Sequence, residues 1–267
     1  MQYDNILFEV NDGVATITLN RPESRNVITG AEIIDELEAA FATVNADMSI
    51  MALIITGADP AFSAGGNVKE MAQKTGMFAG TPAEIEQKYK QYVQRIPLAV
   101  QGVEVPTIAA VNGPAIGAGC DFALMCDMRV ASEKARFGET FLNVGLIPGD
   151  GGAWFLPRVV GMARACELTF TGDVIDGETA FQIGLVNYVV PHDRLLAKTN
   201  ELAAKIAAKP PVALRMAKKL LYMGRQASLQ ELLDQSAAYQ GECHNTEDHL
   251  EALAAMFEKR APRFKGR

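Results

Sequence analysis

The sequence predicts an α/β fold, with a strand–helix core over residues 1–192 and a wholly helical region over residues 193–267. Up to about residue 190, short apolar runs rich in β-branched residues alternate with stretches of helical periodicity. Three small-residue turns each stand between a strand pattern and a helix pattern. Beyond Asp193 only helical patterns follow. Such alternation is typical of a parallel sheet covered by helices.

The first hundred residues open with a predicted antiparallel hairpin of Ile6–Val10 and Val14–Leu19, joined by the turn Asn11-Asp12-Gly13. Residues 51–56 are apolar throughout and predict a strand covered on both faces. A first helix is predicted by apolar residues at helical spacing: Ile33, Ile34, Leu37, Phe41 and Val44. Residues 83–101 are expected to form one helix.

The second part of the chain continues with predicted strands at residues 107–111, 128–131, 136–137 and 186–190. Short helices are expected at residues 154–160, 164–171 and 178–183. In the helical region we expect four helices, at residues 195–208, 211–223, 229–244 and 247–259.

The stretch that organises the chain is Pro106–Met128, in which a strand enters a glycine-broken turn and a helix begins with one acid, Asp121. Close backbone approach at a helix start leaves N–H groups that can hold a phosphate or a developing oxyanion. A dinucleotide-binding G-x-G-x-x-G pattern would need glycine at Phe122. A simple alternative is that Asp121 only complements the helix dipole.

Two further small-residue turns have the same setting. Residues 57–67 lead into a short helix, and Ser63 lacks the G-x-S-x-G context of a nucleophile elbow. Residues 138–152 carry two acids, Glu139 and Asp150, before a helix. Glu139 could instead pair with Arg136 or Arg158, and Asp150 could instead cap the helix at Gly151.

The composition is that of an ordinary globular protein, with 267 residues, 49% hydrophobic and 21% charged. The net charge of −7 argues against nucleic acid or an anionic membrane as a general partner. No apolar run reaches membrane-spanning length and the first residues lack a signal pattern, so a cytoplasmic location is expected.

The four cysteines and three histidines do not predict a metal site. Cys120, Cys126, Cys166 and Cys243 include no C-x-x-C pair, which favours free thiols in a reducing compartment. His244 and His249 lie near Cys243 without the usual zinc spacing.

The chain resembles the enoyl-CoA hydratase/isomerase (crotonase) superfamily over nearly its whole length. No single motif is diagnostic, but many occur in one order. They are Leu19-Asn20-Arg21-Pro22 with Asn26, residues 61–70 (AFSAGGNVKE), residues 109–113 (AAVNG), Gly117-Ala118-Gly119-Cys120-Asp121, Phe137-Gly138-Glu139, Gly145-Leu146-Ile147-Pro148, Thr171-Gly172 with Ala180, Gly184-Leu185-Val186 and residues 257–260 (FEKR).

The resemblance implies a spiral of β-β-α units and a helical C-terminal region that builds a trimer or a dimer of trimers. It implies an acyl-CoA thioester as substrate, with no metal or other cofactor. The backbone N–H groups of Gly66 and Ala118 would stabilise a thioester enolate. The CoA-holding surface would include Ser24, Arg25 and Ala64, with a contact from Lys259.

Departures from the family pattern concern the acids. Family hydratases place glutamates where Asp121 and Phe141 stand, so Phe141 removes one acid from the substrate-binding site. Dienoyl isomerases of the family use an aspartate at the position of Asp121 and a second acid within one residue of Asp150. The expected catalytic carboxylates are therefore Asp121 with either Asp150 or Glu139.

These features predict hydration or double-bond isomerisation of an enoyl-CoA, as in fatty acid metabolism. Thioester hydrolysis or decarboxylation on the same fold, or a non-catalytic acyl-CoA-binding role, are the alternatives. Residues 71–78 and Trp154 are expected to shape the acyl pocket.

Overall fold

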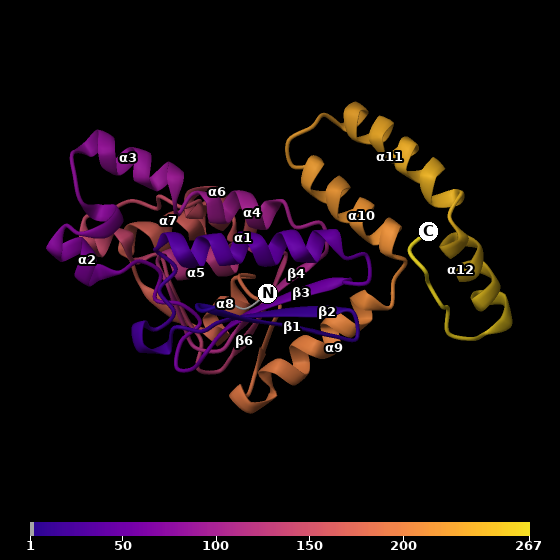
Figure 1. Ribbon diagram of the computed structural model, residues 1–267, viewed down its shortest axis with the longest axis horizontal. Helices are drawn as coiled ribbons and strands as arrows, with labels where there is room; N and C mark the ends of the chain where they lie inside the picture. Colours follow the sequence, from indigo (N-terminus) through magenta and orange to yellow (C-terminus); the bar gives the residue numbers. More distant parts are fainter. Residues whose placement is uncertain (1–2) are drawn as a thin grey trace.

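A computed structural model describes residues 3–267 and contains a six-stranded main sheet (Figure 1). The strand order is β1-β2-β3-β4-β6-β9, in which β1 and β2 form the predicted antiparallel hairpin and all other neighbours are parallel. The strands are β1 (Ile6–Asn11), β2 (Val14–Leu19), β3 (Ala52–Gly57), β4 (Thr107–Val111), β6 (Met128–Ser132) and β9 (Tyr188–Val190). The predicted α/β class is confirmed.

A smaller second sheet makes the chain wind as a spiral. It contains β5 (Pro114–Ile116), β7 (Arg136–Gly138) and β8 (Val174–Asp176). Each turn of the spiral passes from the main sheet to this second layer and then into a helix. Isolated parallel bridges of Ser63 with Ala115 and of Val27 with Gly65 extend the second layer toward the first two turns. The β-β-α spiral implied by the resemblance is therefore present.

The helices agree with the sequence patterns except between residues 83 and 101, where one predicted helix is two. Pro97 has no N–H and its ring clashes with a carbonyl one turn earlier, so the helix cannot run through residues 92–94. The helices are α1 (Ala31–Ala46), α2 (Val68–Gln73), α3 (Pro82–Gln91), α4 (Arg95–Gln101), α5 (Ala118–Met125), α6 (Gly152–Val160), α7 (Met162–Thr171), α8 (Gly177–Gln182), α9 (Leu195–Ala207), α10 (Pro211–Met223), α11 (Leu229–His244) and α12 (Glu247–Glu258).

Alternating side chains of the main sheet pack into two separate apolar cores. Ile55 and Ala109 belong to the larger core, with buried residues of α1, α4 and α5. Ile54 and Ile108 point to the other face, where Leu195 and Ala203 of α9 cover them. Figure 1 shows α1 and α9 on opposite sides of the strands. Both faces are covered, as the continuous apolar pattern of β3 predicted.

The C-terminal helices divide into one that packs on the sheet and three that project from it. The predicted boundary at residue 193 assigns α9 to the helical C-terminal region. In the structure α9 packs on the main sheet, as the helices of the core do. Helix α10 is anchored by Lys218, whose ammonium lies 2.8 Å from both Asp127 Oδ2 and the Val105 carbonyl oxygen. Helices α11 and α12 extend beyond it, away from α2 and α3 (Figure 1).

Two of the small-residue turns are in direct contact. The N–H of Ile116 donates to the Ser63 carbonyl (3.0 Å), and the N–H of Ser63 donates to the Pro114 carbonyl (3.1 Å). A β-carbon on Gly119 would lie 2.1 Å from the Ser63 carbonyl oxygen, so only glycine allows the start of α5 to reach the other turn.

We predict that Gly119→Ala lowers the free energy of unfolding by about 2–4 kcal/mol, because the added methyl group forces the two turns apart. Urea denaturation followed by circular dichroism measures this change. Gly241→Ala is the matched control, since Gly241 lies in α11, where a β-carbon would meet no atom within 4 Å and alanine gains helix propensity. Equal stability of the two variants would contradict the close contact.

Candidate active site

The turn before α2 presents the first free N–H group. The Ser63 hydroxyl donates to the Asn26 carbonyl (2.7 Å) and accepts from the Gly65 N–H (3.0 Å), which fixes the turn from inside. The Asn67 side chain then caps α2 by accepting from two N–H groups of its first turn. Within residues 3–267 the intervening N–H of Gly66 has no protein acceptor.

The turn before α5 presents the second free N–H group beside the first. Gly117 has a φ of 54° and donates its N–H to the Gly138 carbonyl (2.8 Å). Ala118 is the first residue of α5, so its N–H has no acceptor within the helix. A β-carbon on Gly65 would lie 2.8 Å from the Ala118 nitrogen, which places the residue before Gly66 in contact with this N–H.

Three buried carboxyl groups lie together behind these turns. Asp121 is 0% exposed, Glu139 2% and Asp150 3%. Asp121 Oδ2 accepts a hydrogen bond of 3.1 Å from the N–H of Gly152 at the start of α6. A β-carbon on Gly152 would lie 2.1 Å from Asp121 Oδ1, so only glycine lets α6 approach the carboxyl group this closely. The three predicted acids are therefore in one cluster.

Burial raises the pKa values of the cluster, and few hydrogen-bond donors oppose this effect. Asp121 Oδ1 and both carboxyl oxygens of Glu139 and Asp150 have no hydrogen-bond donor among the described residues. Burial, followed by the charges of Asp150 and Glu139, raises the pKa of Asp121 well above its ordinary value. Burial also raises the pKa of Glu139 to about 7 and raises the pKa of Asp150. Carboxyl groups in contact then share protons as hydrogen bonds.

Two further titratable side chains border the cluster. Cys120 lies against Glu139, and burial raises the pKa of this thiol well above its usual range. Tyr89 approaches Asp150: a β-carbon on Gly149 would lie 2.8 Å from the Tyr89 ring. Burial and the charge of Asp150 raise the pKa of Tyr89, so its hydroxyl stays protonated.

A largely apolar cavity of about 570 Å³ opens next to the cluster and the Gly66 turn. Tyr89 belongs to its wall and also approaches Asp150. Met71 lines the cavity too, and its methyl carbon would lie 2.5 Å from a β-carbon on Gly66. The other lining residues are Val68, Ala72, Lys74, Phe78, Gly80, Ile85, Val144 and Leu146. A volume of this size suits a small-molecule acyl group.

The structure brings the predicted CoA-binding residues of the N-terminal half together. The Arg25 carbonyl accepts a hydrogen bond from the Ala64 N–H at 2.8 Å, and Ser24 precedes Arg25 in the same turn. The Phe141 ring lies against Gly117, with its Cζ atom 3.7 Å from the place that a β-carbon would take there. Lys259 does not join them, because it follows α12 at the end of the molecule opposite α2 (Figure 1).

The prediction for residues 71–78 is supported, since Met71, Ala72, Lys74 and Phe78 line the cavity. Trp154, which was also expected to shape the acyl pocket, does not line this cavity. Its indole ring stacks with the guanidinium groups of Arg158 (4.2 Å) and Arg225 (4.3 Å), and it is not part of the cavity wall. Its position on α6 turns the ring toward α10 instead.

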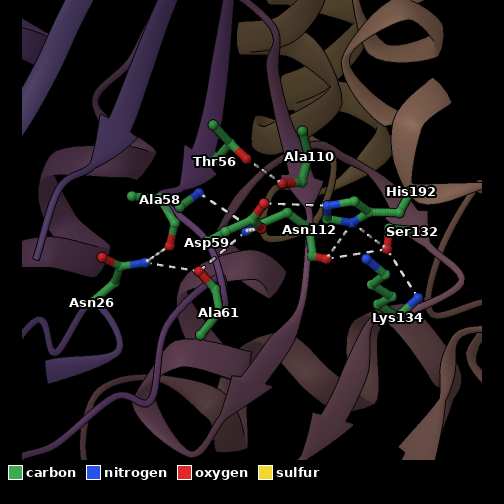
Figure 2. A network of polar contacts seen from close by, with 11 residues as sticks. Asn26, Thr56, Ala58, Asp59, Ala61, Ala110, Asn112, Ser132, Lys134 and His192 are labelled. Carbon is green, nitrogen blue, oxygen red and sulfur yellow. Dashed lines mark hydrogen bonds and ion pairs between the residues drawn. The ribbon is translucent and has the colours of Figure 1, made fainter. Parts of the chain in front are cut away.

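A polar network joins residues 58–61, which precede the Gly66 turn, to Asn26, Asn112 and His192, and sequence patterns did not identify it (Figure 2). Asn26 donates to the carbonyls of Ala58 (2.7 Å) and Ala61 (2.8 Å). Asn112 donates to Asp59 Oδ1 at 2.9 Å, and this hydrogen bond lowers the pKa of Asp59. His192 Nε2 lies 3.3 Å from the other Asp59 oxygen. The partners are up to 133 residues apart, so no local pattern could reveal them.

Comparison with known proteins decides the family. A family model described as enoyl-CoA hydratase/isomerase matches residues 9–267. The chain belongs to this family. Among its relatives, the crotonyl-CoA hydratase of Syntrophomonas wolfei is 36% identical over 265 residues, covering 99% of each chain. The 2,3-dehydroadipyl-CoA hydratase of Escherichia coli is 40% identical over 257 residues, covering 95% of this chain and 96% of the relative.

Solved structures agree with the family assignment. The crystal structure of an enoyl-CoA hydratase from Bacillus anthracis superposes with a TM-score of 0.92 at 34% sequence identity. The match covers 99% of this chain and 100% of the other. The protein is thus an enzyme of the enoyl-CoA hydratase/isomerase family with a crotonase fold. Among residues 3–267, no helix is long and apolar enough to cross a membrane.

We predict that Glu139→Gln makes the protein more stable at alkaline pH, by an amount on the order of 2 kcal/mol. The folded-state pKa of about 7 lies above the ordinary value for glutamate, so the folded state holds more protons between these values. The free energy of unfolding of the natural protein should therefore fall as pH rises from about 4.5 to about 7.

Urea denaturation at about pH 5 and about pH 8 measures the difference. Glu133→Gln is the control, because Glu133 is exposed and should leave the fall in stability in place. A fall that is the same in Glu139→Gln and in the natural protein would mean that Glu139 does not bind a proton in this range.

Proposed function

We propose that the protein hydrates a 2-enoyl-CoA thioester. One observation carries the proposal: a buried carboxyl cluster lies behind two turns in which the N–H groups of Gly66 and Ala118 have no protein partner within residues 3–267. The cavity beside the cluster offers room for an acyl chain. Relatives with 35–40% identity over nearly the whole chain are named as hydratases of enoyl-CoA substrates, which supports this choice over thioester hydrolysis, decarboxylation or simple binding.

In the proposed reaction, the N–H groups of Gly66 and Ala118 bind the thioester carbonyl oxygen. This oxygen gains negative charge as water adds to the double bond, because the electrons of the C2–C3 bond move toward it. Donors already held in place by the protein stabilise that charge without reorganising, and losing one such donor costs about 3 kcal/mol in related chemistry. The partial positive charge at the start of α5 acts in the same direction.

Two carboxyl groups of the cluster move the protons. We assign them to Asp121 and Asp150, since Asp150 also approaches Tyr89 of the cavity wall. The ionised carboxylate accepts a proton from the water molecule while the oxygen of that water bonds to C3. The protonated carboxyl then gives a proton to C2, and the product is a 3-hydroxyacyl-CoA. Because the cluster holds shared protons at neutral pH, one acid and one base are present together.

Glu139 has a different role in the proposed reaction. It interacts with Cys120 and Asp121, whereas Asp150 is the acid that interacts with Tyr89 of the cavity wall, so Glu139 acts on the substrate through Asp121. Its nearby carboxyl group makes ionisation of Asp121 less favourable and keeps a proton in the cluster. Glu139 is a positioning residue in this scheme.

Phe141 favours a second candidate, double-bond isomerisation. Its ring covers Gly117 at the position where family hydratases are expected to carry a glutamate. An apolar ring at this place cannot orient water. Isomerisation needs only removal of one carbon-bound proton and its return to another carbon, which Asp121 with a single partner can perform.

The remaining contacts complete the proposed substrate site. Ser24, Arg25 and Ala64 hold the CoA moiety beside the Gly66 turn, where the backbones of Arg25 and Ala64 are hydrogen-bonded to one another. The proposed reaction adds water and moves protons without transferring electrons to a redox partner, so it requires no cofactor beyond the CoA of the substrate. Lys259 could reach such a site only in a neighbouring copy.

Incubation with 2-enoyl- and 3-enoyl-CoA thioesters in deuterium oxide, followed by mass spectrometry, tests the proposed reaction. We expect 2-enoyl-CoA to gain the mass of one D₂O molecule. Deuterium uptake with no added water would establish isomerisation instead. Release of free CoA or carbon dioxide, or an unchanged substrate across the panel, would contradict both candidates.

We predict that Asp121→Asn lowers turnover by at least about 10²-fold, because an amide cannot exchange a proton with water or with C2. The amide oxygen can still accept from the Gly152 N–H, so the fold should be retained. Steady-state kinetics and thermal melting measure the two effects. Full activity of a correctly folded Asp121→Asn would remove this residue from the mechanism.

We also predict a trimer or a dimer of trimers, with a mass three or six times the chain mass of 28.8 kDa. Exposed apolar side chains on the projecting helices support this assembly: Leu221 is 75% exposed, Leu229 72% and Phe257 78%. Size-exclusion chromatography with light scattering measures the mass, and Phe257→Asp should reduce it. A monomeric natural protein at micromolar concentration would contradict the prediction.

A further inference from the structure

The cavity has one charged residue in an otherwise apolar or uncharged wall. Of the residues that line it, Lys74 alone carries a formal charge. Val68, Met71 and Ala72 of α2 face it from one side, and side chains of the segments 78–89 and 144–146 complete the wall. A purely aliphatic acyl chain would need only apolar walls, so it does not explain why a lysine lines the cavity.

Lys74 has no ionic or hydrogen-bonding partner for its ammonium group among residues 3–267. The neighbouring charged groups are occupied. Lys88 donates to the carbonyls of Gly76 (3.1 Å) and Ala79 (2.8 Å), which fastens the loop after α2 to α3. Glu70 accepts from the Asn67 side chain (2.8 Å), and Glu84 forms the capping box with Thr81. The Lys74 charge is therefore available to a ligand.

The position of Lys74 at the end of α2 sets its distance from Gly66, where the reacting thioester is proposed to bind. The methyl group of Met71 lies against Gly66, where the thioester carbonyl is proposed to bind. Lys74 directly follows α2 as its C-cap residue, three positions after Met71 and therefore about 5 Å farther along the helix axis, and both residues line the cavity. A straight acyl chain that starts near Gly66 and follows Met71 would end near Lys74.

We propose that Lys74 binds a carboxylate at the far end of the acyl chain, which makes enoyl-CoA thioesters of dicarboxylic acids preferred substrates. This inference rests on the proposed function for the reacting end of the site. The methylene groups of the chain contact Met71, Phe78 and Leu146, and the terminal carboxylate accepts a charge-assisted hydrogen bond from the Lys74 ammonium. A chain ending in a methyl group would instead partly desolvate this ammonium without compensation.

Matched substrate pairs and variants test the proposal. We would measure kcat/KM for (E)-2-hexenedioyl-CoA and (E)-2-hexenoyl-CoA, and for the corresponding octenedioyl and octenoyl pair, with the natural protein, Lys74→Met and Lys69→Met. Lys69 is the control because it lies on the same helix but does not line the cavity. Methionine at position 74 keeps a long side chain and the same β-carbon, so the left-handed backbone there (φ 51°) is equally tolerated.

We expect the natural protein to prefer the dicarboxylic member of at least one pair. Lys74→Met should reduce the ratio of kcat/KM values within that pair by about tenfold, as for loss of one charge-assisted contact. Lys69→Met should leave the ratio as it is. A ratio that does not change in Lys74→Met, an equal change in Lys69→Met, or a natural preference for the monocarboxylic substrates would each overturn the proposal.

Binding of saturated thioesters separates this inference from the proposed reaction. Adipyl-CoA and hexanoyl-CoA carry no double bond, so calorimetric titration compares their dissociation constants without catalysis. Tighter binding of adipyl-CoA that is lost in Lys74→Met would support the role of Lys74 even if no enoyl-CoA were hydrated. Equal binding of the two thioesters by the natural protein would overturn it, whatever the enzyme does to enoyl substrates.

Discussion

The backbone contact between the Gly66 turn and the start of α5 is the constraint on which the site depends. Hydrogen bonds between residues 62–63 and 114–116 join two turns that are far apart in the sequence. Because these bonds use the neighbouring N–H groups, the N–H groups of Gly66 and Ala118 are held in place yet remain without partners in the described part of the chain. Free donors with fixed positions are what electrostatic stabilisation of an oxyanion requires.

The contact between the two turns requires glycine at its closest point, and the carboxyl cluster also requires glycine where α6 approaches Asp121. A methyl group at Gly119 would collide with Ser63, and one at Gly152 would collide with Asp121. The Gly152 N–H is the only N–H donor that reaches the Asp121 carboxyl among the described residues. Three acids with so few donors favour protonation, which destabilises the folded protein at alkaline pH but supplies an acid beside a base.

The sequence was sufficient to predict much of the fold and the identity of the clustered acids. Local periodicity placed most helices and strands, and the ordered motifs indicated the family whose spiral then brought Asp121, Glu139 and Asp150 together. The division of residues 83–101 was missed because helical periodicity was given more weight than Pro97. Long-range contacts were beyond the sequence patterns: Tyr89 meets Asp150 although neither residue stands in a recognisable motif with the other. The contact of Trp154 with Arg225 depends on where the segment after α10 lies relative to α6, which no pattern within α6 can specify.

The arrangement of acids around Asp121 gives a physical reason for an aspartate where family hydratases are expected to carry glutamate. The Gly152 N–H holds the carboxyl group of Asp121 toward α6, and Asp150 enters from the turn just before that helix. Phe141 instead occupies the side of Gly117 with an apolar ring. In the proposed mechanism, the second acid therefore comes from the start of α6 instead of the turn after β7. A shorter side chain at position 121 therefore matches a partner that approaches from α6, and in the proposed mechanism this pair acts on water and the substrate carbon next to Tyr89.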